Sequence, residues 1–233
     1  MKNYFKRLYE RTMREAHAQA YAEIVRALRG GGNVLDCGAN TGKTFHRLNE
    51  FLPLERERYR GIEWNGEVLE IARRDGLDVV KGDLNRRLPF DDDSFDCVFG
   101  LSVIEHLLNG CRFIRECRRV LKPGGTLVLL TPNISTYFTA ALILAGRMPS
   151  SGPHPDSEEL IKREELFKVS SELTASDAES DEPVHRHLVV FSYRVLHDFL
   201  GMAGFREVSG RGYGLYPFPN FMQPLLERLD PWH

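Results

Sequence analysis

The chain has few cysteines and none of the spacings that bind zinc. Its four cysteines are Cys37, Cys97, Cys111 and Cys117, and no two of them form a C-x-x-C pair. Cys37 and Cys97 fall in apolar runs that predict strands, where a buried thiol is common. The sequence therefore predicts neither a disulfide framework nor a zinc site.

Positive and negative charges are nearly equal in number, which argues against nucleic-acid binding. Lysines and arginines number 31 against 33 acidic residues, for a net charge of -2. Because nucleic-acid binding depends on many Lys and Arg contacts to phosphates, no nucleic-acid partner is expected. Residues 1–30 are the basic exception, and their interleaved apolar side chains predict an amphipathic helix that packs on the domain.

Long hydrophobic runs are also missing. The longest, near Phe138–Ala145, is too short to span a bilayer, so no stable membrane insertion is expected. The N-terminal stretch has no apolar region of the signal-peptide type and no small-residue cleavage site. These absences, with 42% hydrophobic and 27% charged residues, are typical of a globular protein of the cytoplasm.

What the sequence does contain is an alternation of short apolar runs with helix-like segments. Such alternation predicts βαβ units, and hence a doubly wound, mostly parallel α/β sheet of the Rossmann-like kind in three layers, α/β/α. Asn65 is placed to cap a helix and Gly76 to end it, while Pro123-Gly124-Gly125 is typical of a turn. The expected strands are Asn33–Gly38, Tyr59–Trp64, Asp78–Gly82, Phe95–Leu101 and Gly125–Thr131, and the expected helices are Lys43–Phe51, Asn65–Arg74 and Cys111–Leu121.

The composition changes after the fifth expected strand. Residues 150–183 hold ten acidic and three basic residues with many serines and prolines, which predicts a solvated acidic insertion. Ser192 then caps an expected helix that runs to Met202, and a sixth strand is expected at Phe205–Gly210.

The segment Val34–Gly42, VLDCGANTG, is the most informative motif. An apolar strand ends in Asp36, and a glycine-rich turn leads into a helix, at the edge where open α/β sheets bind ligands. A phosphate-binding loop needs four residues between its first glycine and the Gly-Lys-Thr, but Gly38 and Gly42 enclose three. A dinucleotide site binds pyrophosphate at this turn, and a carboxylate just before the first glycine would repel it. This chain has Asp36 there, which suits a cationic ligand instead.

This motif resembles D-x-G-x-G-x-G of the class I S-adenosylmethionine-dependent methyltransferases, with Asn40 in place of the middle glycine. Asn tolerates a left-handed backbone well. Further matches follow in the family's order: Glu63-Trp64 after the second strand, Asp83-Leu84 after the third, the run from Leu88 to Val98, Val103–Leu107 after the fourth, and Lys122–Gly125 before the fifth. The resemblance implies that S-adenosylmethionine is held by Asp36, Gly38, Asn40, Gly42, Glu63, Trp64, Asp83 and Leu84, with Glu63 on the ribose and Asp83 on the adenine.

The resemblance also implies a division of the chain. One methyltransferase domain would span 1–233, with a helical cap at 1–30, a cofactor-binding core at 31–135, an insertion or lid at 136–190 and a C-terminal part at 191–233. The cap and the insertion are expected to cover the acceptor. That acceptor is expected to be a small molecule of the glycan, lipid or quinone type.

A general base is needed only if the acceptor must lose a proton. His106 and His185 are the residues expected to act there, with His154 and His187 as further candidates for the base. Candidates for contact with the acceptor are Tyr4, Tyr9, His154, His185 and Arg186. His185 and His187 form an H-x-H pair, which indicates a metal only if a third ligand joins, so no metal is expected. Two alternatives stay open: a catalytically silent cofactor-binding partner protein and, less favoured, an NAD-dependent oxidoreductase.

Overall fold

The computed structural model describes residues 2–148, 187–213 and 225. Within these residues the strands are β1 (Val34–Cys37), β2 (Tyr59–Glu63), β3 (Asp78–Lys81), β4 (Phe95–Leu101) and β5 (Leu121–Leu130). The helices are α1 (Lys2–Leu28), α2 (Lys43–Asn49), α3 (Gly66–Arg74), α4 (Gly110–Val120), α5 (Tyr137–Leu144) and α7 (Tyr193–Met202), with 3-10 turns η1 (Arg56–Arg58) and η2 (Ile104–His106). The acidic insertion expected at 150–183 lies outside the described residues.

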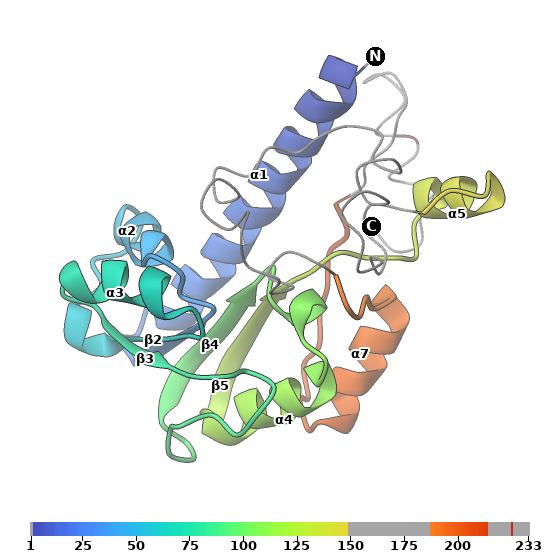
Figure 1. Cartoon of the computed structure of the whole chain (residues 1–233). Coiled ribbons are helices and arrows are strands. Elements are labelled where there is room, and N and C mark those ends of the chain that lie inside the picture. Colours follow the sequence, from blue (N-terminus) through green and yellow to red (C-terminus); the bar gives the residue numbers. More distant parts are fainter. Residues whose placement is uncertain (1, 149–186, 214–224, 226–233) are drawn as a thin grey trace.

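The sheet is parallel throughout and has the order β3-β2-β1-β4-β5. The chain builds outward from β1 through β2 to β3, then returns to the other side of β1 with β4 and β5 (Figure 1). The strand order therefore reverses between β1 and β4, and the loops after these two strands flank the switch point where open α/β sheets bind ligands. The predicted doubly wound, parallel arrangement is confirmed.

Two hydrophobic cores cover the two faces of the sheet. Val34 belongs to a core shared with α1, α2 and α3, whereas its neighbour Leu35 belongs to a core shared with α4 and α7. Successive side chains of a strand point to opposite faces, so the two cores lie on opposite sides of β1. This gives the predicted three layers, with α1 packed behind β4 and β5 (Figure 1).

Local signals set the helix ends. The Asn65 side chain accepts hydrogen bonds from the backbone amides of Glu67 and Val68, which caps α3 as expected. Gly76, with φ of 78°, follows the last residues of α3, and a left-handed glycine is a common way to end a helix. Ser192 caps α7 through the amide of Val195. All four cysteines are unpaired in the structure, and Cys37, Cys97 and Cys117 are buried.

The start of β5 differs from the prediction. Pro123-Gly124-Gly125 was expected to form a turn before the strand, but β5 already begins at Leu121, which pairs with Phe95. Thr126 then pairs with Cys97, so β5 advances by five residues between these two pairs while β4 advances by two. The excess residues form an irregular bulge around Gly124, whose φ of 80° suits glycine. The bulge absorbs the turn-forming residues without ending the strand.

The expected sixth strand at Phe205–Gly210 does not form. After α7 the described chain runs through a bend at Arg206 and Glu207 and then has no regular structure up to Tyr213. Instead of pairing with β5, Phe205 packs with Ala203 and Leu200 against the core beneath α4 and α7. This prediction was wrong because a short β-prone run needs a neighbouring strand, and sequence alone does not supply one.

Candidate functional site

The loop from β1 to α2 is a cradle of three left-handed residues. Gly38, Asn40 and Gly42 have φ values of 86°, 48° and 81°. The backbone amides of Gly38 and Ala39 both donate to the carbonyl of Ile62, which holds the loop against the end of β2. Asn40 stabilises its own conformation by accepting a hydrogen bond from the Thr41 amide on its side-chain oxygen, at 2.7 Å. Asn40 therefore occupies the left-handed position where the resemblance has a glycine.

Two further features of this loop suit a bound ligand. A Cβ on Gly38 would lie 2.7 Å from Val103 Cγ2, so the missing side chain lets the loop approach the segment after β4. The Thr41 hydroxyl is buried and has no hydrogen-bond partner among the described residues. A buried polar group without a partner carries a free-energy cost that a ligand can relieve. The loop is thus built for close approach and has a polar group left to satisfy.

Glu63 ends β2 and connects the loop to the second strand. Its Oε1 accepts the amides of Trp64 and Asn65, at 2.9 and 3.0 Å, and its Oε2 accepts the Asn40 amide at 3.0 Å. A carboxylate offers about four acceptor positions. Three are filled by backbone amides, so Oε2 retains capacity for one further donor. The carboxylate both shapes the cradle and is equipped to bind one hydroxyl.

The other predicted cofactor residues gather along the same edge of the sheet. Trp64 directly follows Glu63, and its side chain is 42% exposed. Asp83 follows β3, and its Oδ1 accepts both the backbone and side-chain nitrogens of Asn85. Leu84 is buried beside Ile62 in the core on the α4 side. The amide of Gly82 donates to the carbonyl of Glu63 at 3.0 Å, which fixes the ends of β2 and β3 side by side.

Asp36 lies in a different environment from the rest of this set. It is 2% exposed, and its Oδ2 accepts a 2.6 Å hydrogen bond from the Tyr59 hydroxyl. Burial raises the pKa of Asp36 to about 7; the Tyr59 hydrogen bond opposes the rise and the charge of Glu63 adds to it. The side chain lies on the face of β1 that carries the α1–α3 core. Its described contact is therefore to the core, and direct contact with the cofactor stays a prediction.

The burial of Asp36 predicts a pH-dependent stability. Because the folded pKa is raised, this group favours the folded state below about pH 4 and loses that advantage as the pH rises to about 7, a change on the order of 4 kcal/mol. Asp36→Asn keeps an acceptor for Tyr59 but cannot ionise. Thermal melts at pH 5 and pH 8 should show a larger loss for the wild type than for the variant. Parallel losses would contradict an ionisable, buried Asp36.

His106 is the last residue of η2, directly after β4, and its ring lies 5.4 Å from the ring of His187 between centroids. Glu105 beside it is buried, and burial raises the pKa of its carboxyl to about 7. The predicted catalytic residue His185 and the candidates His154 and Arg186 lie outside the described residues. The side chains of Tyr4 and Tyr9 on α1 do as well.

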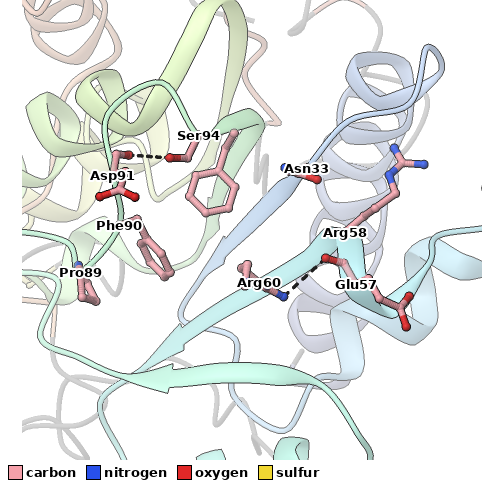
Figure 2. Close-up of a pocket in the computed structure, with 9 residues that line it drawn as sticks. Asn33, Glu57, Arg58, Arg60, Pro89, Phe90, Asp91 and Ser94 are labelled. Atoms are coloured by element: carbon pink, nitrogen blue, oxygen red, sulfur yellow. Dashed lines mark hydrogen bonds between the residues drawn. The ribbon is translucent and has the colours of Figure 1, made fainter.

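The cavity in Figure 2 lies at the other end of the strands. It has a volume of about 270 Å³ and is lined by residues that precede or begin β1, β2 and β4, among them Asn33, Arg58, Arg60 and Phe90. These residues lie at the amino ends of the strands, whereas the loop with Asn40 and the Glu63 carboxylate lie at the carboxyl ends. The cavity is therefore separate from the candidate cofactor site.

Sequence reasoning missed two residues of this region. Tyr59 was assigned only to a strand, because nothing in a β-rich run marks which hydroxyl will meet Asp36. Glu105 was seen as part of the segment after the fourth strand and given no role. Its position at the carboxyl end of β4, next to His106, was the available signal.

Comparison with known proteins supports the interpretation of this edge. A family model described as a methyltransferase domain matches residues 35–129, from the second residue of β1 to the penultimate residue of β5. The phthiotriol/phenolphthiotriol dimycocerosates methyltransferase of Mycobacterium tuberculosis is 28% identical over 202 residues, which cover 81% of this chain and 70% of that protein.

Two further similarities bear on the same core. A protein of Mycolicibacterium smegmatis named "Probable S-adenosylmethionine-dependent methyltransferase" is 44% identical over 66 residues; these span 28% of this chain but only 25% of that relative. The crystal structure of a SAM-dependent methyltransferase from Thermotoga maritima superposes with a TM-score of 0.50 and 23% identity, covering 89% of this chain and 82% of that one, which supports the fold. The match to a methyltransferase domain over residues 35–129, the order of the motifs and the parallel sheet agree: the central part of this chain is similar to S-adenosylmethionine-dependent methyltransferases.

Proposed function

We propose that this chain transfers the methyl group of S-adenosylmethionine to a hydroxyl group of an apolar small molecule of the lipid type. One observation carries the proposal for the cofactor. The Glu63 carboxylate accepts the Asn40 amide of the left-handed β1 loop and still has room to accept one more hydrogen bond. The acceptor part is supported by the surface around α5 and by the relative from M. tuberculosis.

The residues of the carboxyl edge fit the parts of the cofactor. Glu63 Oε2 would accept one ribose hydroxyl, and the partly exposed Trp64 and the buried Leu84 would pack against the adenine. Asp83 would accept from the adenine amine, with Asn85 holding its carboxylate in place. The Thr41 hydroxyl would gain the partner that it lacks. When bound, S-adenosylmethionine supplies a methyl group activated by a sulfonium, so the protein contributes mainly position and electrostatics.

His106 would act on the acceptor side. It follows β4, and Val103 of the same segment lies beside Gly38 of the cofactor loop. A neutral imidazole can take the proton of a hydroxyl as the oxygen attacks, because its ordinary pKa lies near neutrality. His106 would thus hold the acceptor oxygen next to the methyl group and remove its proton.

The apolar character of the acceptor is inferred from α5. This helix follows β5 and, in Figure 1, lies beyond the carboxyl ends of β4 and β5, the side on which the cofactor loop lies. Its exposed side chains include Tyr137, Ile143 and Leu144, the last 89% exposed. A cluster of exposed apolar side chains commonly marks a binding surface. Among the described helices, none has the length and hydropathy that crossing a membrane requires.

A transfer assay tests the proposal. The purified chain is incubated with S-adenosylmethionine labelled in its methyl group and with three acceptors: a long-chain alcohol, an alkyl-substituted phenol and a free sugar. Label should enter the apolar hydroxyl compounds and not the sugar. Binding of S-adenosylmethionine without transfer to any acceptor would favour the silent cofactor-binding alternative, and transfer to the sugar alone would contradict the apolar acceptor.

A pair of surface variants examines the role of α5. Leu144→Asp should raise KM for the apolar acceptor by about tenfold, the equivalent of about 1.4 kcal/mol, with little change in the affinity for S-adenosylmethionine. Met202→Asp is the matched control, since Met202 is 82% exposed on α7. Equal KM values for the two variants would remove α5 from the acceptor site.

A further inference from the structure

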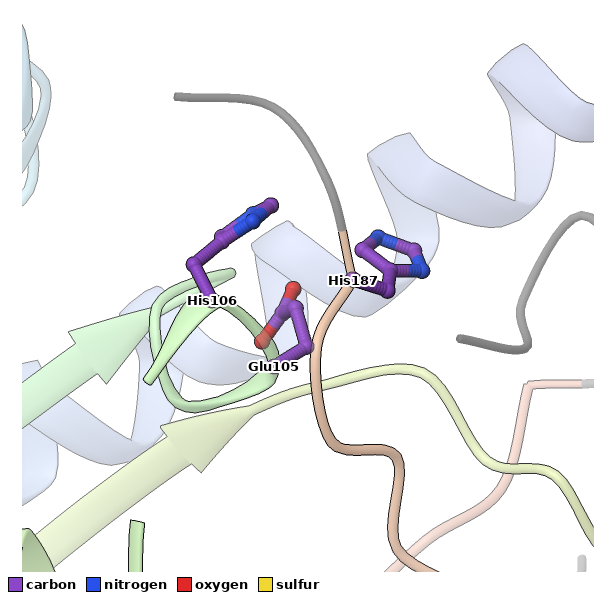
Figure 3. A group of neighbouring side chains, drawn as sticks. All are labelled: Glu105, His106 and His187. Atoms are coloured by element: carbon purple, nitrogen blue, oxygen red, sulfur yellow. The ribbon is translucent and has the colours of Figure 1, made fainter. Parts of the chain in front are cut away.

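Three potential metal ligands meet just beyond the carboxyl end of β4. Glu105, His106 and His187 each offer one donor atom, and these atoms all lie within 4.8 Å of one another. Figure 3 shows Glu105 and His106 on the turn after β4, and His187 on the segment that leads toward α7. Two segments far apart in sequence therefore contribute to one cluster.

Backbone hydrogen bonds hold the two segments together. The carbonyl of Glu105 accepts the amide of Leu188 at 2.7 Å and that of Val189 at 3.2 Å. These bonds place His187, the residue before Leu188, next to η2. The cluster is thus fixed by backbone geometry as well as by its side chains.

Within the part of the chain that the structure describes, no lysine or arginine compensates the charge of Glu105. The residue is 1% exposed, and Thr131 Oγ1 donates to its Oε2 at 3.0 Å. Among the described residues, no lysine or arginine forms an ion pair with it. Burying a carboxylate without a counter-charge is costly, and proteins resolve this by protonation, by pairing or by metal coordination. The nearest titratable neighbours shown are two histidines, which are metal ligands when neutral.

We propose that Glu105, His106 and His187 form a binding site for a divalent transition-metal cation of the Zn²⁺ or Fe²⁺ class. Two imidazoles and one carboxylate are the protein ligands of many such sites, and they leave coordination positions open. Bonds to these ligands are about 2.0–2.2 Å long, so the donors must approach one another more closely than 4.8 Å. Rotation of the partly exposed His106 and His187 side chains would achieve this.

Only His187 of the H-x-H pair belongs to this cluster, because His185 lies outside the described residues, and the other two ligands come from the segment after β4. The proposed site replaces the sequence-based expectation of no metal. The role of this cation rests on the proposed function. Its open positions would bind an oxygen of the acceptor, because the cluster includes His106 and lies beyond β4, the strand next to β1 and its cofactor loop. A bound cation lowers the pKa of a coordinated hydroxyl. In the metal-bound protein the cation would therefore replace His106 as the group that activates the hydroxyl, whose proton would pass to solvent, because the lone pair of His106 is then used for coordination.

Cobalt binding tests the site without any dependence on methyl transfer. The full chain is stripped with a chelator and titrated with Co²⁺, whose visible absorption reports coordination by protein ligands, and Zn²⁺ is then added in competition. We expect one equivalent of Co²⁺ to bind, Zn²⁺ to displace it, and His187→Ala and His106→Ala each to weaken binding by at least tenfold. His197→Ala is the control, because this histidine lies on α7 away from the cluster.

The outcomes separate the two proposals. Absence of stoichiometric Co²⁺ binding, or binding as tight in His187→Ala as in His197→Ala, would overturn the metal site. Since Glu105 is buried and its replacement can affect folding, Glu105→Gln is compared only after its melting temperature is measured. Normal Co²⁺ binding in a chain that transfers no methyl group to any acceptor would support the cation site and count against the proposed function alone.

Discussion

Replacing Glu63 with alanine is expected to weaken binding of S-adenosylmethionine by about 100-fold. A hydrogen bond to a charged group contributes about 1.5–3 kcal/mol, equivalent to about 10- to 150-fold in affinity. The substitution also removes the acceptor for the Asn40 amide, so the β1 loop loses one of its attachments to β2. Both effects weaken the same site. Isothermal titration with S-adenosylmethionine and S-adenosylhomocysteine measures the change.

Arg60→Ala is the control for this experiment. Arg60 lies on the same strand, is partly exposed, and pairs with Asp78 at 2.9 Å near the amino ends of the strands. Its loss should leave cofactor affinity within about twofold, because Arg60 lies at the opposite end of the strands from the cofactor loop. The fold should also be little affected, since exposed ion pairs contribute little to stability. Equal affinity of the Glu63 variant and the wild type would refute the role of Glu63. Binding of NAD in place of S-adenosylmethionine would revive the oxidoreductase alternative.

Replacing Gly42 with alanine should destabilise the fold by about 2–5 kcal/mol. Gly42 has φ of 81°, a conformation that costs a residue with a Cβ about 1–2 kcal/mol. The added Cβ would also lie 2.3 Å from Leu77 Cδ1, and overpacking a filled core costs about 1–3 kcal/mol. Leu77 is buried in the core with residues of α2 and α3, so its side chain has little room to move away from the added Cβ. Thermal unfolding monitored by circular dichroism would show the loss.

A second glycine separates the two causes. Gly124 has φ of 80°, but nothing lies within 4 Å of its hypothetical Cβ. Gly124→Ala should therefore show only the backbone cost, about 1–2 kcal/mol. The double variant Gly42→Ala/Leu77→Ala should not show the clash, although it loses the packing of Leu77. Equal melting temperatures for Gly42→Ala and Gly124→Ala would show that Leu77 moves aside without cost.

Most of the sheet could be predicted because its strands are apolar runs bounded by polar or turn-forming residues. The predicted limits of β1 to β4 differ from the observed ones by at most one residue at each end. The same signals misled at β5, since Pro123-Gly124-Gly125 has the composition of a turn and becomes a bulge only because β4 offers partners on both sides of it. Pairing with a neighbour decides such cases, and composition does not contain it.

The candidate site was predictable in part for a related reason. Asp36 and Glu63 lie in the last residues of β1 and β2, Gly38 and Asp83 follow β1 and β3, and parallel strands bring their ends to one edge. The burial of Asp36 against Tyr59 depends on which face of β1 each residue occupies, and on the helices that cover it. The meeting of His187 with Glu105 depends on hydrogen bonds between distant segments. Neither has a periodic signal in the sequence.

The bulge in β5 also affects how this protein would behave at high concentration. Within the described residues β3 and β5 are the outer strands of the sheet, and an outer strand with free amides and carbonyls can recruit a second chain into an intermolecular sheet. Pro123 supplies no amide, and the bulge breaks the regular spacing beside it. β3 is only four residues long and has exposed charged residues at both ends, Asp78 and Lys81. Among the strands described, Thr126–Leu130 is therefore the stretch that most favours aggregation by strand addition.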